Sequence, residues 1–293
     1  MFPSKRRKKA LIQKKRLLYF CLLILFTSLF YGCDKVEQMK VKLGMKNNDF
    51  EYIKQGKIKK IVIQNTRDTG FRFIVTDKKA IEELYDILSS AKAVEAKSDL
   101  EPDYIFEMEE GPNKVYRFSY VAGLDKENAG NLYSADKVYL VSERIDNDII
   151  KSFWNIRKPK DFNKIYYRTI LDIAEKYSKE ESKGRSIGIN IYDDVDVAKF
   201  ILSADLDEFK GSLTSKVSNA ELMIQPKGEQ KQKEYDIAMN VKTVGYKTFL
   251  YKGEITFWDK ENKSEKKYYI TMTYKSTDGR WVTKIDTTKP EKW

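Results

Sequence analysis

The sequence predicts an α+β fold of two small domains with mainly antiparallel sheets, after an N-terminal signal or anchor and a tether. An unbroken apolar run near the N-terminus ends at Cys33. Strand-like runs and amphipathic helical patterns then alternate, and the last third is dominated by strands separated by hairpin turns. The predicted boundaries are 1–33 for the signal, 34–57 for the tether, 58–157 for the first domain and 158–293 for the second.

Residues 1–33 have the order of an export signal. Eight basic residues precede an apolar stretch that runs from Leu17 to Tyr31 and ends on Gly32 and Cys33. Leu17 to Gly32 is 16 residues, fewer than the roughly 20 that a spanning helix needs. A basic segment followed by such a stretch directs export, and a cysteine at the cleavage point can be acylated. Cys33 is therefore the predicted lipid-attachment residue.

Residues 30–33 resemble the lipobox of bacterial lipoproteins. Gly32 fits that motif, whereas Phe30 stands where Leu is usual and Tyr31 where a small residue is usual. An uncleaved signal anchor is the alternative. Both readings place the rest of the chain at the cell membrane on its extracytoplasmic side, because the basic flank stays inside.

Charge and residue usage exclude several classes of function. The formal charge of +11 includes the eight basic residues of the signal. The remainder therefore has 47 basic and 44 acidic residues. This balance gives no reason to expect nucleic acid as a partner. The chain has no histidine, and its two cysteines are Cys21 and Cys33. We therefore predict no catalytic triad, cofactor or metal site in the mature body.

The first domain is predicted to open with a hairpin of residues 59–64 and 71–75. Asp77 is the predicted N-cap of a helix over 78–91, where apolar residues recur at helical spacing. Further strands are expected at 104–108, 115–120 and 137–141, followed by a helix from Ser142 or Asp146 to Trp154.

This order of elements, with Pro102-Asp103-Tyr104 and Tyr139-Leu140-Val141-Ser142 as its clearest pieces, resembles the YhfM-like lipoproteins of Gram-positive bacteria. The resemblance covers residues 58–155. It implies an envelope-anchored domain and no site residues, because that family has no assigned activity.

The second domain is predicted to begin with a helix over 162–178 capped by Asp161, followed by a strand over 187–192. Residues 194–203 and 205–213 are predicted to be helical. An antiparallel meander then closes the chain, with strands at 222–225, 235–244, 248–258, 267–274 and 280–285. Helices followed by such a meander resemble the cone-shaped nuclear transport factor 2-like fold, which hosts enzymes and binding proteins alike.

Three groups of side chains are candidates for chemistry. The densest acidic stretch does not fit a calcium loop, and roles as helix caps or as first-turn partners of the helix dipole explain Asp194 and Asp205; its members are Asp193, Asp194, Asp196, Asp205, Asp207 and Glu208. The loop from Asp125 to Gly130 is interpreted as a plain turn. Aromatic residues of the last sheet favour packing over a sugar-binding platform; they are Tyr246, Phe249, Tyr251, Phe257, Trp258, Tyr268, Tyr269, Tyr274 and Trp281.

Taken together, these patterns predict a membrane-anchored, extracytoplasmic lipoprotein that is not an enzyme and that binds another envelope component, either a protein or a glycan. Two alternatives stay open. One is a carboxylate-based hydrolase of cell-wall polymer. The other is a small-ligand binder with a cavity in the C-terminal domain.

Overall fold

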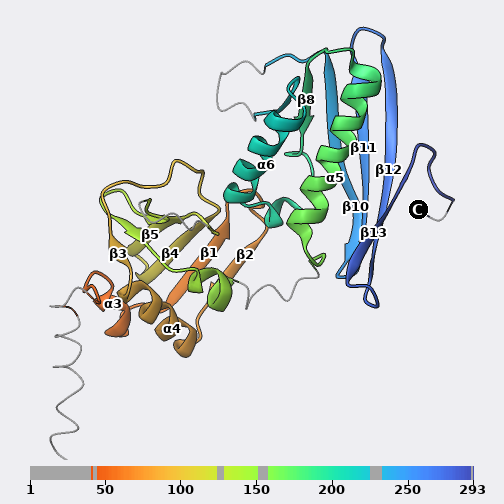
Figure 1. Ribbon diagram of the computed structural model, residues 1–293. Helices are drawn as coiled ribbons and strands as arrows, with labels where there is room; N and C mark the ends of the chain where they lie inside the picture. Colours follow the sequence, from red (N-terminus) through yellow and green to blue (C-terminus); the bar gives the residue numbers. More distant parts are fainter. Residues whose placement is uncertain (1–40, 42–44, 124–128, 151–157, 225–232, 292) are drawn as a thin grey trace, which may run out of the picture.

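The computed structural model of the protein describes residues 41, 45–123, 129–150, 158–224, 233–291 and 293. These residues form two units, each built on one β-sheet with its own hydrophobic core (Figure 1). We call residues 45–150 the first unit and residues 158–293 the second unit. The predicted α+β class with mainly antiparallel sheets is confirmed.

The sheet of the first unit has seven strands in the order β2-β1-β4-β5-β6-β7-β3, and all neighbouring strands are antiparallel. Inward-facing aromatic residues such as Phe106 on β4 and Tyr120 on β5 fill its core. The strands are β1 (Lys60–Asn65), β2 (Arg72–Val75), β3 (Lys92–Ala93), β4 (Tyr104–Gly111), β5 (Lys114–Tyr120), β6 (Leu132–Tyr133) and β7 (Val138–Leu140).

Helix α4 (Lys78–Ser89) packs into this core through Leu84 and Leu88. The Asp77 carboxylate accepts a hydrogen bond from the Ala80 amide at 2.9 Å, so the predicted N-cap is confirmed. The helix expected from Ser142 or Asp146 to Trp154 is a π-helix, η1 (Ile145–Ile150), as far as the described residues extend.

The predicted tether is wrong at its C-terminal end, because residues 47–56 pack against the first unit. The Asn47 amide donates to the backbone carbonyls of Leu88 and Ala91 at 2.9 and 2.8 Å. Phe50 and Ile53, the latter in the short helix α3 (Glu51–Lys54), are almost fully buried. The buried side chains and the Asn47 hydrogen bonds together hold this segment on the core.

The sheet of the second unit has six strands in the order β13-β12-β11-β10-β8-β9. The meander is antiparallel as predicted, whereas β8 pairs in parallel with both β10 and β9. The strands are β8 (Ile187–Asn190), β9 (Ala220–Leu222), β10 (Ile237–Lys247), β11 (Leu250–Asp259), β12 (Ser264–Lys275) and β13 (Arg280–Asp286).

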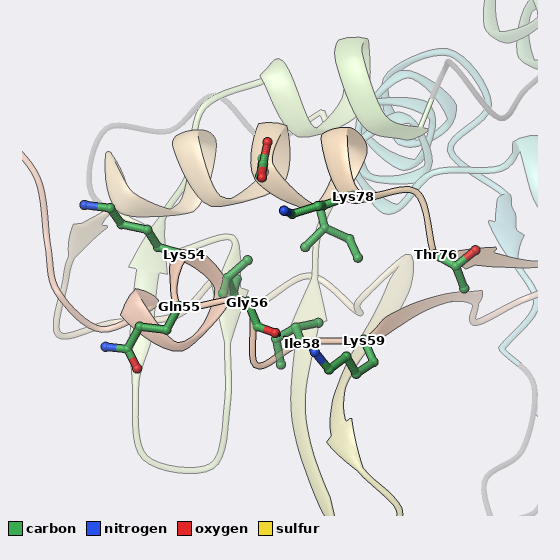
Figure 2. Close-up of a pocket in the computed structure, with 10 residues that line it drawn as sticks. Lys54, Gln55, Gly56, Ile58, Lys59, Thr76 and Lys78 are labelled. Atoms are coloured by element: carbon green, nitrogen blue, oxygen red, sulfur yellow. Dashed lines mark hydrogen bonds between the residues drawn. The ribbon is translucent and has the colours of Figure 1, made fainter.

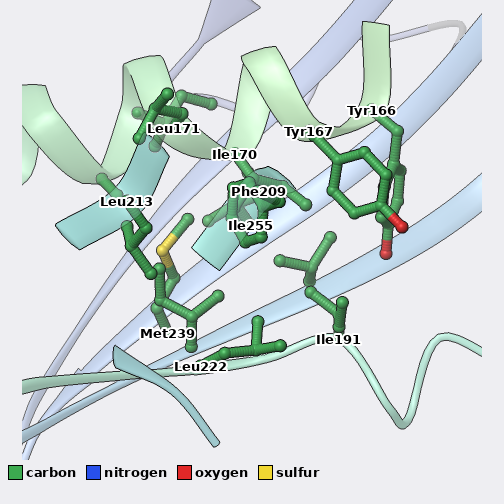
Figure 3. Packing of buried hydrophobic residues seen from close by; sticks show 14 of the residues in the cluster. Tyr166, Tyr167, Ile170, Leu171, Ile191, Phe209, Leu213, Leu222, Met239 and Ile255 are labelled. Carbon is green, nitrogen blue, oxygen red and sulfur yellow. The ribbon is translucent and has the colours of Figure 1, made fainter. Parts of the chain in front are cut away.

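Helices α5 (Phe162–Tyr177) and α6 (Ser203–Lys216) supply the rest of the second core (Figure 3). Figure 3 shows Leu171 of α5 near Leu213 of α6, and the Tyr167 ring of α5 stacks on the Phe209 ring of α6 with a centroid distance of 5.1 Å. Phe200, Phe257 and Tyr268 are at most 1% exposed and fill the interior of this unit. The cavity predicted for the C-terminal domain stays a prediction, although one of the hollows described below is lined in part by Tyr167, Leu171 and Phe209 of this core.

Two local predictions in the second unit are wrong. Asp161 does not cap α5 through its side chain: its backbone is left-handed with φ of 53° rather than extended, and its carboxylate makes no capping hydrogen bond. Within the range 194–203, a 3₁₀ turn, η4 (Ala198–Phe200), is the one regular segment that precedes α6.

Within the described ranges, no helix is long and apolar enough to cross a membrane. The predicted signal, including Cys33, lies outside the described residues.

Candidate functional site

A buried ionic network joins the two units at the start of α6. The Asp103 carboxylate, which is fully buried, binds the Arg67 guanidinium and accepts the amides of Ala122 and Ser203, both at 2.8 Å. Arg67 also donates to the Ile201 carbonyl at 3.1 Å and to the Ser203 hydroxyl. An aspartate of the first unit thus caps a helix of the second, although α6 has no capping side chain of its own.

Beside this network, residues of both units line a cleft of about 460 Å³. Such a volume lies in the range of roughly 300–1,000 Å³ typical of small-molecule sites. The first unit contributes Tyr104, Ala122, Gly123, Glu143, Asp146, Asn147 and Ile150, and the second contributes Lys158, Asn163, Leu202 and Asp205. A second hollow of about 460 Å³ between α5 and α6 shares Asn163 and Asp205 with this cleft.

Asp205 and Asn163 line both hollows. The Asn163 amide donates to the Asp205 carboxylate at 2.6 Å. Burial raises the pKa of Asp205 to about 6, although the charge of Lys158 and the Asn163 hydrogen bond act in the opposite direction. Asp205 lies in the first turn of α6, as the sequence predicted.

Two polar atoms near this pair are buried without a hydrogen-bond partner: the amide oxygen of Asn163 and the hydroxyl of Tyr167. Burial raises the pKa of Tyr167 above its ordinary value, and the Asp205 charge raises it further, so the hydroxyl stays protonated. An unsatisfied buried polar group costs about 1–3 kcal/mol. Asn163 lines both hollows and Tyr167 lines the hollow between α5 and α6, so both unpaired atoms lie in the region around Asp205, where a polar ligand would satisfy them.

The cleft offers more hydrogen-bond acceptors than donors. Its lining includes three carboxylates, on Glu143, Asp146 and Asp205, and the amide oxygens of two asparagines, against the Lys158 ammonium, the Tyr104 hydroxyl and the amide nitrogens of the same asparagines. Such a lining suits a ligand that carries several hydroxyl or ammonium donors.

The pKa of Asp205 leads to a prediction about stability and pH. Its folded-state value of about 6 exceeds the unfolded value of about 3.9, so the folded state binds the proton more tightly. The contribution of Asp205 to wild-type stability should therefore fall as the pH rises from about 4 to about 6 and then level off. Asp205→Asn removes this titration and keeps an acceptor for the Asn163 amide.

We expect the Asp205→Asn variant to gain stability relative to the wild type between pH 4 and pH 6, and the gain to be constant above that range. Urea unfolding at several pH values measures the difference in the free energy of unfolding between the two proteins. The contributions of titratable groups that both proteins share cancel in this difference. A difference independent of pH would contradict the raised pKa.

Of the other members of the predicted acidic stretch, Glu208 lines the hollow between α5 and α6 together with Asp205, whereas Asp193 and Asp194 are engaged elsewhere. Asp194 is not a helix cap: its carboxylate is buried in the second unit and accepts hydrogen bonds from the Tyr166 hydroxyl at 3.0 Å and from the amide and hydroxyl of Thr243 at 2.9 and 2.8 Å. The Asp193 carboxylate accepts the Asn190 amide. Among the described residues, no group of three or more carboxylates or other ligands is arranged to hold a metal.

The remaining candidates have different outcomes. Most of the loop from Asp125 to Gly130 lies outside the described residues. Tyr251, Phe257 and Tyr268 are core residues. In contrast, Phe249 is 49% exposed and its ring stacks on Tyr274 at 5.5 Å.

A third hollow, of about 420 Å³, lies between α3 and the start of α4 in the first unit (Figure 2). Lys54, Lys59 and Lys78 line it together with Glu82. The Lys59 ammonium donates a hydrogen bond to the Gly56 carbonyl at 2.9 Å. One of the three ammonium groups in this lining therefore already has a hydrogen-bond acceptor within the protein.

The fold and the cleft thus define a protein of two α+β units joined by a buried ionic network. Residues 54–159 match the family model described as YhfM protein, which confirms the resemblance of the first unit. Neither a curated protein nor a solved structure matches the chain. The nuclear transport factor 2-like resemblance of the C-terminal part therefore stays a prediction.

The matched region contains Arg67, Asp103 and one wall of the cleft, whereas Asn163 and Asp205 lie beyond it. Sequence reasoning singled out Pro102-Asp103-Tyr104 as a motif but missed the role of Asp103, and it missed Asn163 entirely. Asn163 and Asp205 lie near the starts of α5 and α6. Two polar residues at these positions were the signal in the sequence that could have indicated the site.

Proposed function

We propose that this protein is a lipid-anchored, extracytoplasmic binding protein. Acylated Cys33 holds it at the cell membrane, and the cleft between the units binds an envelope glycan. The basic segment, the apolar run and the Gly32-Cys33 end support the anchor. The anchor would keep the cleft at a high effective concentration near its ligand.

The observation that carries the binding role is the set of polar atoms around Asp205. The carboxylate and the Asn163 amide oxygen accept hydrogen bonds, whereas the protonated Tyr167 hydroxyl donates one. A sugar presents adjacent hydroxyl groups that can both donate and accept, so it satisfies these atoms without requiring a full charge. A glycan therefore fits the lining better than an anion does.

Calorimetric titration tests this role. The probe is a soluble disaccharide fragment of cell-wall glycan, added to the protein purified from membranes in detergent. Hydrogen bonds to charged groups contribute about 1.5–3 kcal/mol, so we expect Asp205→Ala to weaken binding by about 10-fold to 100-fold. Asp207→Ala, on the exposed side of the same helix, is the matched control. Absence of binding by the wild type, or equal losses in both variants, would refute the role.

One observation favours a carboxylate-based hydrolase as a second candidate. Glu143, Asp146 and Asp205 line one cleft, and a carboxyl with a pKa of about 6 can hold the proton that a general acid donates. Incubation with cell-wall glycan distinguishes the two functions. New reducing ends that disappear in Asp205→Asn would support the hydrolase, whereas binding without new reducing ends supports the binding protein.

A further inference from the structure

Strand β13 leaves one side of the second sheet open. It is the last strand in the sheet order, and its described pairings are all with β12. Val282 is 39% exposed and Ile285 is 45% exposed. An open edge with exposed apolar side chains can pair with another strand.

The described residues that follow β13 form no strand along this edge. Trp293 instead packs edge-on against Tyr269 of β12 at 5.0 Å, and its indole donates to the Thr271 hydroxyl at 3.3 Å. Tyr269 and Thr271 pair with Asp286 and Lys284 on the outer face of the sheet. The tail therefore ends over a face of the sheet.

The sequence of β13 is complementary to itself in one antiparallel register. With Thr283 on a two-fold axis, Arg280 of one copy faces Asp286 of the other, and Trp281 faces Ile285. Opposite charges and apolar side chains placed directly opposite each other stabilise strand pairs. Both pairs occur twice across the axis, because a two-fold interface uses the same surface on each copy.

The neighbouring two-fold registers are disfavoured by charge. A shift of the axis to Val282 places Arg280 opposite Lys284, and a shift to Lys284 places that lysine opposite its own copy. Shifts of the axis by half a residue would pair side chains of opposite faces. Charge therefore selects the register centred on Thr283.

The uncovered face beside β13 agrees with this register. Trp281 pairs with Tyr274, whose ring lies 5.5 Å away, and Ile285 pairs with Ile270 of the core. In the paired form, Ile285 of the second copy would cover Trp281. In the single chain, Arg280 contacts Asp278 at 3.4 Å and Lys284 contacts Asp286 at 2.8 Å. Such surface ion pairs contribute little to stability, so Arg280 and Asp286 can change partners when a second copy binds.

We propose that two copies of this protein pair through β13 and form one continuous sheet across a two-fold axis at Thr283. Sedimentation velocity on the protein purified from membranes, in density-matched detergent, tests this. The wild type should have about twice the mass of one chain. Arg280→Glu and Asp286→Arg should each reduce the mass to that of one chain, and the double variant should restore it.

Two controls separate pairing from misfolding and from general charge effects. Lys210→Glu, an exposed reversal on α6, should leave the dimer intact, and circular dichroism should show all variants folded. Thr283→Cys should form a disulfide-linked dimer on oxidation that the wild type, with its own cysteines, does not form. A monomeric wild type, a dimer that resists both reversals, or failure of the double variant to restore it would overturn the proposal.

Discussion

Replacing Asp103 with alanine is expected to lower the free energy of unfolding by about 3–5 kcal/mol. The substitution leaves the Arg67 guanidinium, which is 16% exposed, without its carboxylate. It also leaves the amides of Ala122 and Ser203 without their acceptor. Urea unfolding monitored by circular dichroism measures the loss.

Two further variants show whether the loss of stability in Asp103→Ala comes from the buried ionic network. Asp86→Ala, at a carboxylate that is 65% exposed, should cost much less. Because Arg67 and Asp103 act as a pair, the double variant Arg67→Ala/Asp103→Ala should cost less than the sum of the single variants. An Asp103→Ala variant as stable as Asp86→Ala would show that the network does not hold the units together.

Replacing Cys33 with alanine is expected to abolish acyl labelling and lipoprotein-type cleavage. The reason is chemical: the Cys33 thiol is the predicted attachment point, and stable anchoring needs the attached chains. Metabolic labelling with an alkyne fatty acid measures the acylation, and mass spectrometry of the intact protein measures the cleavage. Cys21→Ala, within the apolar run, is the matched control and should label normally.

Unchanged labelling of the Cys33→Ala variant would reject the assignment. Retention of the original N-terminus by an unlabelled wild type would favour the uncleaved signal anchor. The two forms therefore differ in both labelling and mass.

Local signals explain the parts of the fold that the sequence predicted well. The Asp77 cap and the helix that follows depend on contacts within a few residues, and the hairpins of the second sheet depend on alternation and turn residues. The parallel pairing of β8 with β10 joins segments about 50 residues apart, and no local pattern specifies it.

The cleft could not be predicted either, because its residues are brought together by contacts between distant parts of the sequence. The hydrogen bond from Ser203 to Asp103 spans 100 residues, and the one from Arg67 to Ser203 spans 136. The helical propensity of residues 205–213 was visible, but the partner that caps α6 comes from the other unit. Asp194 likewise has the pattern of a cap, although burial beside Tyr166 and Thr243 makes it a core carboxylate.

Photo-cross-linking on intact cells tests the central claim, that the cleft between the units is the binding site. A photoreactive phenylalanine analogue is placed at position 147, on the rim of the cleft, or at position 210, on the exposed side of α6. The account predicts a glycan adduct, identified by mass spectrometry, at position 147 alone. Equal adducts at both positions, or no adduct at position 147, would contradict it.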